Sequence, residues 1–119
     1  MILLRKTLTM LVAVLTVCVS GVVRAEFTAS EYLELKDLPE MKSYVTGVGR
    51  GILWTNSVAV NQYGHPPLFC VPTKFGMDET VILSLLDQEI RRPSRDYQPE
   101  TFPIELILVV SFQERFPCD

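Results

Sequence analysis

Apolar residues in this chain recur mainly at steps of three and four, which is the spacing of one face of an α-helix. One such run comprises Met41, Tyr44, Val45, Val48 and Ile52, and another comprises Val81, Ile82, Leu85, Leu86 and Ile90. Proline and glycine separate the runs, and strand-like alternation is rare. The pattern predicts an all-α fold, a small bundle of about four helices with irregular loops.

The helix starts carry recognisable capping sequences. Thr28 followed by Glu31 is the spacing of a capping box and predicts a short first helix to about Lys36. Asp37 before Pro39 predicts the start of a long second helix, with Asp37 as the cap. We expect Trp54, near the end of that helix, to lie in the core.

Three glycines interrupt the second helix at alternate positions, and each costs about 1 kcal/mol relative to alanine. Gly47 and Gly51 lie one turn apart, so we expect another backbone to pack closely there, from the same chain or from a partner subunit. A homodimer through this face is therefore possible. The alternative interpretation is a helix that kinks or frays.

The stretch 61–76 contains several prolines and predicts an irregular loop. Asp78 then predicts the cap of a third helix that Pro93 ends, with Asp87, Glu89 and Arg91 facing water.

A fourth helix is expected from about Pro103 to Phe116, buried on most sides because its sequence is almost continuously apolar. Its β-branched residues also permit a strand, but a strand needs partners.

Residues 1–25 have the composition of a secretory signal peptide. Arg5 and Lys6 precede a mostly apolar run, and the segment ends in Val23-Arg24-Ala25. The apolar run is shorter than the ~18 to 20 residues of a membrane-spanning helix, which disfavours an uncleaved anchor. We therefore expect cleavage after Ala25 and a periplasmic protein with no membrane segment after cleavage. Lipidation at Cys18 is a minor alternative, because Val17 is not the small residue it requires.

Cleavage would leave one domain, residues 26–119, that is distinctly acidic. The whole chain has a net charge of −3, and the 8 basic and 14 acidic residues of the mature part give −6. A chain of this charge is unsuited to binding nucleic acid phosphates.

The mature part keeps two cysteines, Cys70 and Cys118, which would meet an oxidising compartment. A disulfide between them closes a loop of nearly fifty residues, for which the chain-entropy estimate is roughly 4 kcal/mol. Two distant cysteines with His65 as the only histidine do not resemble a zinc set or a nucleophilic Cys–His pair. No cofactor, metal site or catalytic group is expected, and an enzyme is the least favoured class.

Candidate anchors for a protein partner are exposed aromatic and basic residues, the types that dominate binding energies. They are Tyr63, His65, Arg92, Arg95 and Tyr97. A solvated helix end with complementary cations is the simpler interpretation of the arginines.

Three segments follow one another along the chain: residues 44–48 (Tyr-Val-Thr-Gly-Val), 69–72 (Phe-Cys-Val-Pro) and 116–118 (Phe-Pro-Cys). In this order they resemble the second-helix segment, the first cysteine motif and the terminal cysteine motif of the Rap/Tai family of immunity proteins, which is associated with type VI secretion amidase toxins. The likeness covers most of Tyr32–Cys118.

This resemblance implies a small periplasmic helical protein that binds and blocks a secreted peptidoglycan amidase toxin. The alternative is a small periplasmic chaperone or envelope stress protein, for which the 14 carboxylates would make acid the natural trigger.

Overall fold

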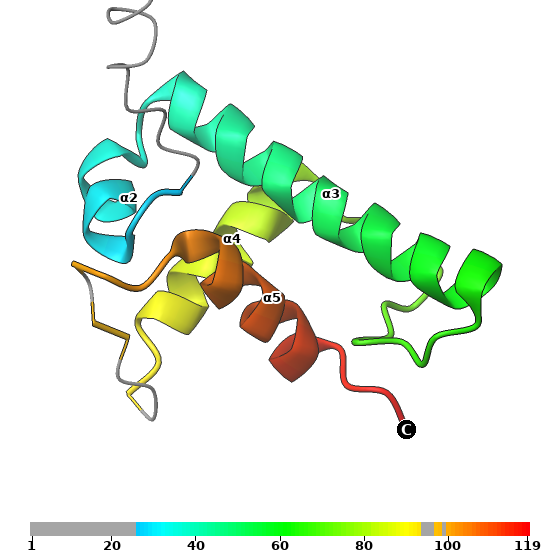
Figure 1. The fold of residues 1–119 in the computed structure, drawn as a ribbon. Coiled ribbons are helices and arrows are strands. Elements are labelled where there is room, and N and C mark those ends of the chain that lie inside the picture. Colours follow the sequence, from blue (N-terminus) through cyan, green and yellow to red (C-terminus); the bar gives the residue numbers. More distant parts are fainter. Residues whose placement is uncertain (1–25, 94–96, 99) are drawn as a thin grey trace, which may run out of the picture.

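The computed structural model describes residues 26–93, 97–98 and 100–119, and within these ranges the chain forms helices and no strand. The helices are α2 (Ala29–Leu35), α3 (Pro39–Tyr63), α4 (Glu79–Ile90) and α5 (Ile104–Arg115). The long helix α3 lies along one side of the bundle, and α4 and α5 pack on its other side (Figure 1). The prediction of an all-α bundle of about four helices is confirmed. The predicted signal peptide lies outside the described residues.

Two of the predicted caps are present and one is wrong. The Thr28 side chain accepts a hydrogen bond from the Glu31 N–H at 3.2 Å, and the Asp78 side chain accepts one from the Val81 N–H at 2.9 Å. Helix α3 instead begins after Leu38, without a side-chain cap. Pro39 keeps the residue before it extended and starts the helix with its own fixed φ, which leaves Asp37 one position too early.

Helix α3 also runs further than the sequence predicts, through Trp54 to Tyr63. Gly64 ends it with a φ of 67°, in the left-handed region. The N–H groups of Gly64 and His65 donate to the carbonyls of Val60 and Ala59, so the last turn is closed by a glycine-based cap. The three glycines do not break the helix.

Close packing on α3 occurs at Gly49, and not at Gly47 or Gly51 within this chain. A Cβ at residue 49 would lie 2.7 Å from Cγ2 of Ile82 on α4, whereas at residues 47 and 51 it would meet nothing within 4 Å. Two residues along a helix correspond to about 200° of rotation. Gly49 therefore faces the core together with Val45, whereas Gly47 and Gly51 face outward.

The core lies between α3, α4 and α5. Ile82, Leu86, Ile107, Leu108 and Phe112 are each at most 1% exposed. Helix α5 is fully buried along one face, half-buried at Glu105, Val109 and Val110, and exposed at Leu106 (54%), so its burial is less complete than expected.

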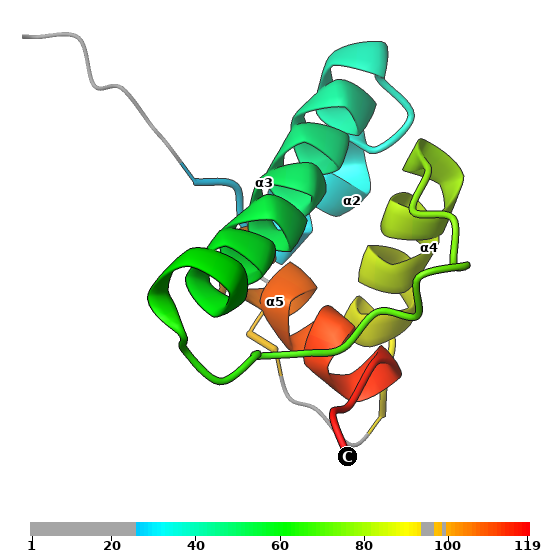
Figure 2. The same cartoon turned by 90° about the vertical axis from the view of Figure 1, so that its right-hand side faces the viewer.

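The disulfide between Cys70 and Cys118 is present, with Cα atoms 5.1 Å apart. The Cys70 N–H also donates to the Phe116 carbonyl at 2.8 Å. In Figure 2 the chain after α3 crosses in front of α5 on its way to α4. The disulfide therefore fixes the loop 64–78 to the end of the last helix. No helix in the described part of the chain is both long enough and apolar enough to cross a membrane.

Candidate protein-docking surface

An open groove of about 540 Å³ lies between the second half of α3, the loop after it and α5. Its lining is mostly apolar and includes Val48, Ile52, Ala59, Pro66, Leu68 and Val109. His65 is the only titratable residue among those that line it. This groove, defined here as the α3–loop groove, suits an uncharged apolar occupant.

The groove is open because α3 carries two small residues along its edge. Gly51 lines the groove, and a Cβ built there would touch nothing within 4 Å. Ala59, two turns further on, adds only a methyl group. From α5, only Val109 reaches the groove. Small residues on α3 therefore keep the groove open.

The loop that forms the other wall is fixed by one side chain of α3. The Asn56 amide nitrogen donates to the Phe69 carbonyl at 3.0 Å, and the Asn56 amide oxygen accepts from the Leu68 N–H at 2.9 Å. Phe69 is 1% exposed and packs on Phe112 with ring centroids 5.2 Å apart. Because backbone and core hold residues 68–69, the Leu68 side chain is left 60% exposed at the rim.

Other large apolar side chains are exposed close to the groove in the sequence of α3. Trp54 is 71% exposed, Tyr63 73% and Val58 38%. The expectation that Trp54 lies in the core is wrong. Trp54 follows the buried Val45 by nine residues, which is two and a half turns, so it projects from the opposite side of the helix.

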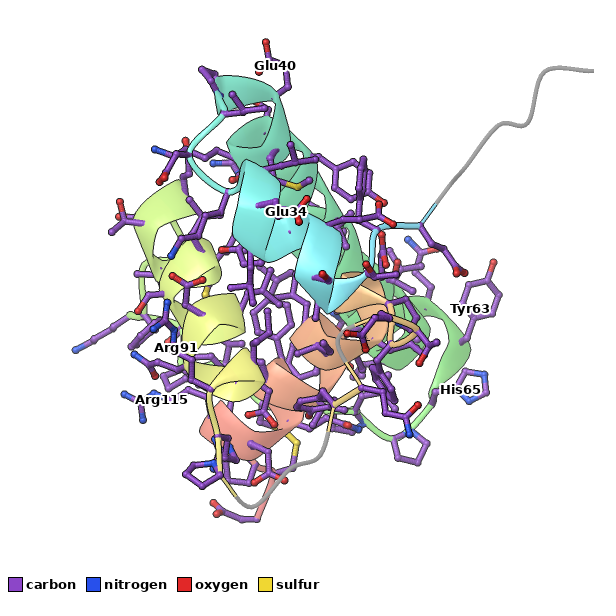
Figure 3. All side chains as sticks on the ribbon, turned by 90° about the vertical axis from the view of Figure 1, so that its left-hand side faces the viewer. Glu34, Glu40, Tyr63, His65, Arg91 and Arg115 are labelled. Atoms are coloured by element: carbon purple, nitrogen blue, oxygen red, sulfur yellow. A yellow bond between two sulfur atoms is a disulfide. The ribbon has the colours of Figure 1, made fainter. Side chains whose placement is uncertain are left out.

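Two of the predicted anchors, Tyr63 and His65, are exposed and lie together. Figure 3 shows both projecting from the carboxyl end of α3, whereas Arg91 and Arg115 lie on the other side of the molecule. His65 also lines the groove. These two residues therefore belong to the candidate surface.

Arg92 and Tyr97, two further predicted anchors, are both hydrogen-bonded to the carboxylate of Glu89. The Tyr97 hydroxyl donates to one Glu89 carboxylate oxygen at 2.7 Å, and Arg92 Nε donates to the other at 2.9 Å. Glu89 is 1% exposed, so the expectation that it faces water is also wrong. A buried carboxylate needs such partners, and these two side chains hold the chain after α4 against the core. Arg95 lies outside the described residues.

Two tyrosines of the bundle are hydrogen-bonded to carboxylates. The Tyr32 hydroxyl donates to Asp87 at 2.8 Å, and burial, followed by this bond, raises the Tyr32 pKa well above its ordinary value. The Tyr44 hydroxyl donates to Glu105, and burial together with that carboxylate raises the Tyr44 pKa to about 12. Both bonds join different helices and therefore stabilise the bundle.

The groove was not predicted as a unit. Sequence reasoning singled out Gly51 and His65 but not Asn56, because an asparagine inside a helix gives no signal that it will bond to a loop twelve residues later. Among the described residues, no group of three or more His, Cys, Asp or Glu is placed to hold a metal ion. No family model matches this chain, and no curated protein or solved structure matches it.

Proposed function

We propose that this chain is a periplasmic immunity protein that binds and occludes a peptidoglycan amidase toxin delivered by type VI secretion. The observation that carries the proposal is the α3–loop groove with its exposed apolar rim. Exposed apolar surface of this kind marks sites of association in soluble proteins. The family resemblance supplies the class of partner.

The composition of the surface supports a protein partner. Trp54 and Tyr63 are of the residue types that contribute most to interface energies, and both are more than 70% exposed. The groove beside them can accept an apolar side chain of the toxin. Occlusion needs only tight contact over the toxin's substrate cleft, so the inhibitor requires no catalytic group.

The disulfide supports a role for the loop as a rigid wall. Residues 65–68 lie between the cap of α3 and Cys70, and Asn56 holds the last of them, Leu68, through its backbone N–H. A wall ordered before binding loses less conformational entropy when the partner arrives, which increases affinity.

The direct test is calorimetric titration of the mature protein with purified periplasmic amidase toxins encoded beside its gene, together with an assay of peptidoglycan cleavage. We expect binding and loss of cleavage. Leu68→Ser removes an apolar rim residue, and Ala59→Gln fills the groove. Each should weaken binding by about tenfold or more.

The matched control is Leu106→Ser, which changes a leucine of similar exposure, 54% against 60%, that does not line the groove. It should bind like the unchanged protein. Absence of binding to every adjacent amidase would count against the proposal. If Leu68→Ser and Ala59→Gln bound as tightly as Leu106→Ser, the groove would not be the binding site.

A further inference from the structure

The chain just after the expected cleavage point is held against the start of α5. The Phe27 carbonyl accepts from the Ile104 N–H at 2.9 Å, and the Phe27 N–H donates to Oε1 of Glu105 at 3.3 Å. The Phe27 ring also packs edge-on against the ring of Tyr44 on α3, with centroids 4.9 Å apart. The backbone is therefore fixed within one residue of Glu26, the expected new N-terminus.

The carboxylate of Glu105, in the first turn of α5, has partners on only one of its two oxygens. Oε1 accepts from the Tyr44 hydroxyl and from the Phe27 N–H. Oε2 is buried and accepts no hydrogen bond from any residue that the structure describes. A buried carboxylate oxygen without a donor is unfavourable, because it has lost contact with water and gained no bond in exchange. One more donor would stabilise this site, and a cationic donor would form the strongest bond.

The charge around Oε2 is negative. Burial, followed by Glu105 and then by Glu26, raises the pKa of the Tyr44 hydroxyl. The charged groups that act on this hydroxyl are thus both carboxylates, one on α5 and one on the N-terminal residue itself. A positive charge placed beside them would be attracted to both.

Signal cleavage after Ala25 would create such a charge next to the site. Hydrolysis of this peptide bond consumes one water, whose oxygen goes to the Ala25 carboxylate and whose two hydrogens make the Glu26 nitrogen an ammonium. That nitrogen is three covalent bonds from the Phe27 nitrogen, so the two lie within about 4 Å of each other. Rotation about the Glu26 Cα–C bond can then turn the ammonium toward Glu105 while Phe27 stays in place.

We propose that the α-ammonium of Glu26, formed when the signal peptide is removed, binds Oε2 of Glu105 and completes the pairing of this carboxylate. The unprocessed chain carries a neutral amide at the same position, so cleavage adds an ion pair that joins the N-terminus to α5 and, through Tyr44, to α3. Processing should therefore stabilise the folded bundle. The proposal rests on cleavage after Ala25 and is independent of the toxin.

The test uses protein exported from the full-length gene, with intact mass to identify its first residue as Glu26. NMR titration of the α-proton of Glu26 then gives the pKa of the α-ammonium. An ordinary α-amino group titrates at about 7.7–8.0. The Glu105 carboxylate should raise this pKa by about one unit or more, because a nearby negative charge favours the protonated form.

Two variants separate the ion pair from a purely structural role of Glu105. Glu105→Gln keeps the shape of the side chain but removes its charge, and it should return the α-amino pKa to the ordinary range. Insertion of Gly-Ser between Ala25 and Glu26 moves the new ammonium two residues away and should do the same. The insertion replaces no residue of the bundle, so it is informative even if Glu105→Gln does not fold. The matched control is Glu79→Gln at an exposed site of α4, which should leave the pKa raised.

The same ion pair predicts how stability depends on pH. Because the pKa is raised in the folded state, the added stability is fully present below the pKa of the unfolded chain and is lost as the pH rises through the folded value. The urea midpoint of the exported protein should therefore fall between about pH 8 and 9.5, below the range in which tyrosines ordinarily titrate. The insertion variant should show no such fall.

An exported protein that begins at another residue would overturn the proposal, as would an α-amino pKa in the ordinary range. A raised pKa that Glu105→Gln and the insertion both leave unchanged would also overturn it. None of these measurements involves the amidase, and neither Glu26 nor Glu105 lines the α3–loop groove, so failure here is distinct from failure to bind a toxin.

Discussion

The glycines of α3 should respond to alanine with opposite signs. Each Gly→Ala change removes about 1 kcal/mol of helix-propensity cost. At Gly47 the new methyl group meets nothing within 4 Å, so the full gain should appear as added stability. At Gly49 the same methyl group would lie 2.7 Å from Ile82 Cγ2, 3.2 Å from Cδ1 and 3.4 Å from Cγ1.

The cost at Gly49 exceeds the gain. Ile82 is fully buried, and overpacking of this kind costs about 1–3 kcal/mol. The net effect of Gly49→Ala should be a loss of up to about 2 kcal/mol. The difference between the two variants is therefore about 1–3 kcal/mol.

Urea unfolding of the oxidised protein, followed by circular dichroism, measures both values. The experiment should be run at two protein concentrations, because association would add to the apparent stability. A double variant with Ile82→Ala provides the internal check. Removing the facing side chain should make Gly49→Ala stabilising, with a coupling energy of about 1–3 kcal/mol. If Gly49→Ala proved as stable as Gly47→Ala in the unchanged background, the close approach of α4 to α3 would be refuted.

Three further predictions concern the bundle. Glu89→Gln keeps the shape of the side chain but removes its charge, and it should destabilise the fold by about 1–3 kcal/mol in urea unfolding, whereas Glu79→Gln at an exposed site of the same helix should change little. Reduction of the disulfide should lower the unfolding free energy by up to about 4 kcal/mol, and a denaturant midpoint unchanged by a dithiol would contradict this. Because the pKa values of Tyr32 and Tyr44 are raised in the folded protein, the folded state binds more protons than the unfolded state above pH 10, so stability should fall as the pH rises from 10 to 12. The Tyr32→Phe, Tyr44→Phe double variant should lose part of that slope, and an unaltered slope would refute the assignment.

The sequence was sufficient for the elements with local signals. Thr28 and Asp78 are caps because their side chains reach an N–H three residues later, and this depends only on spacing. The end of α3 was placed too early, because polar residues follow Trp54 and the helix leaves the bundle there. Such a segment stays helical through its own backbone hydrogen bonds, and the helix ends only where Gly64 adopts a positive φ.

The features that depend on long-range contact were not available from the sequence. Glu89 lies seven residues after Ile82, at the spacing of the buried face of α4, and only its charge suggested a solvated position. Arg92 and Tyr97, which return over the end of α4, supply the hydrogen bonds that the buried carboxylate needs. Asn56 likewise becomes a structural residue only once Phe69 is inserted in the core. The sequence pointed to Gly47 and Gly51 as packing sites, but helix α4 packs against Gly49 instead. Of the three glycines, only Gly49 lies on the face of α3 that points to the core.

The proposed docking surface follows from a difference in length between the helices. Helix α3 has 25 residues, about 37 Å, whereas α4 and α5 have 12 each, about 18 Å. The two short helices can cover only part of the long one, so the segment from about Gly51 to Tyr63 keeps its apolar residues partly in solvent. Exposing Trp54 and Leu68 brings no stability to the isolated domain, because burial of apolar area is what stabilises a fold. The exposed segment nevertheless is held rigidly, by Asn56 on one side and by the disulfide beyond it. A rigid apolar surface that the chain itself does not cover is best explained by association with another molecule, and the proposed occupant of the groove is a toxin.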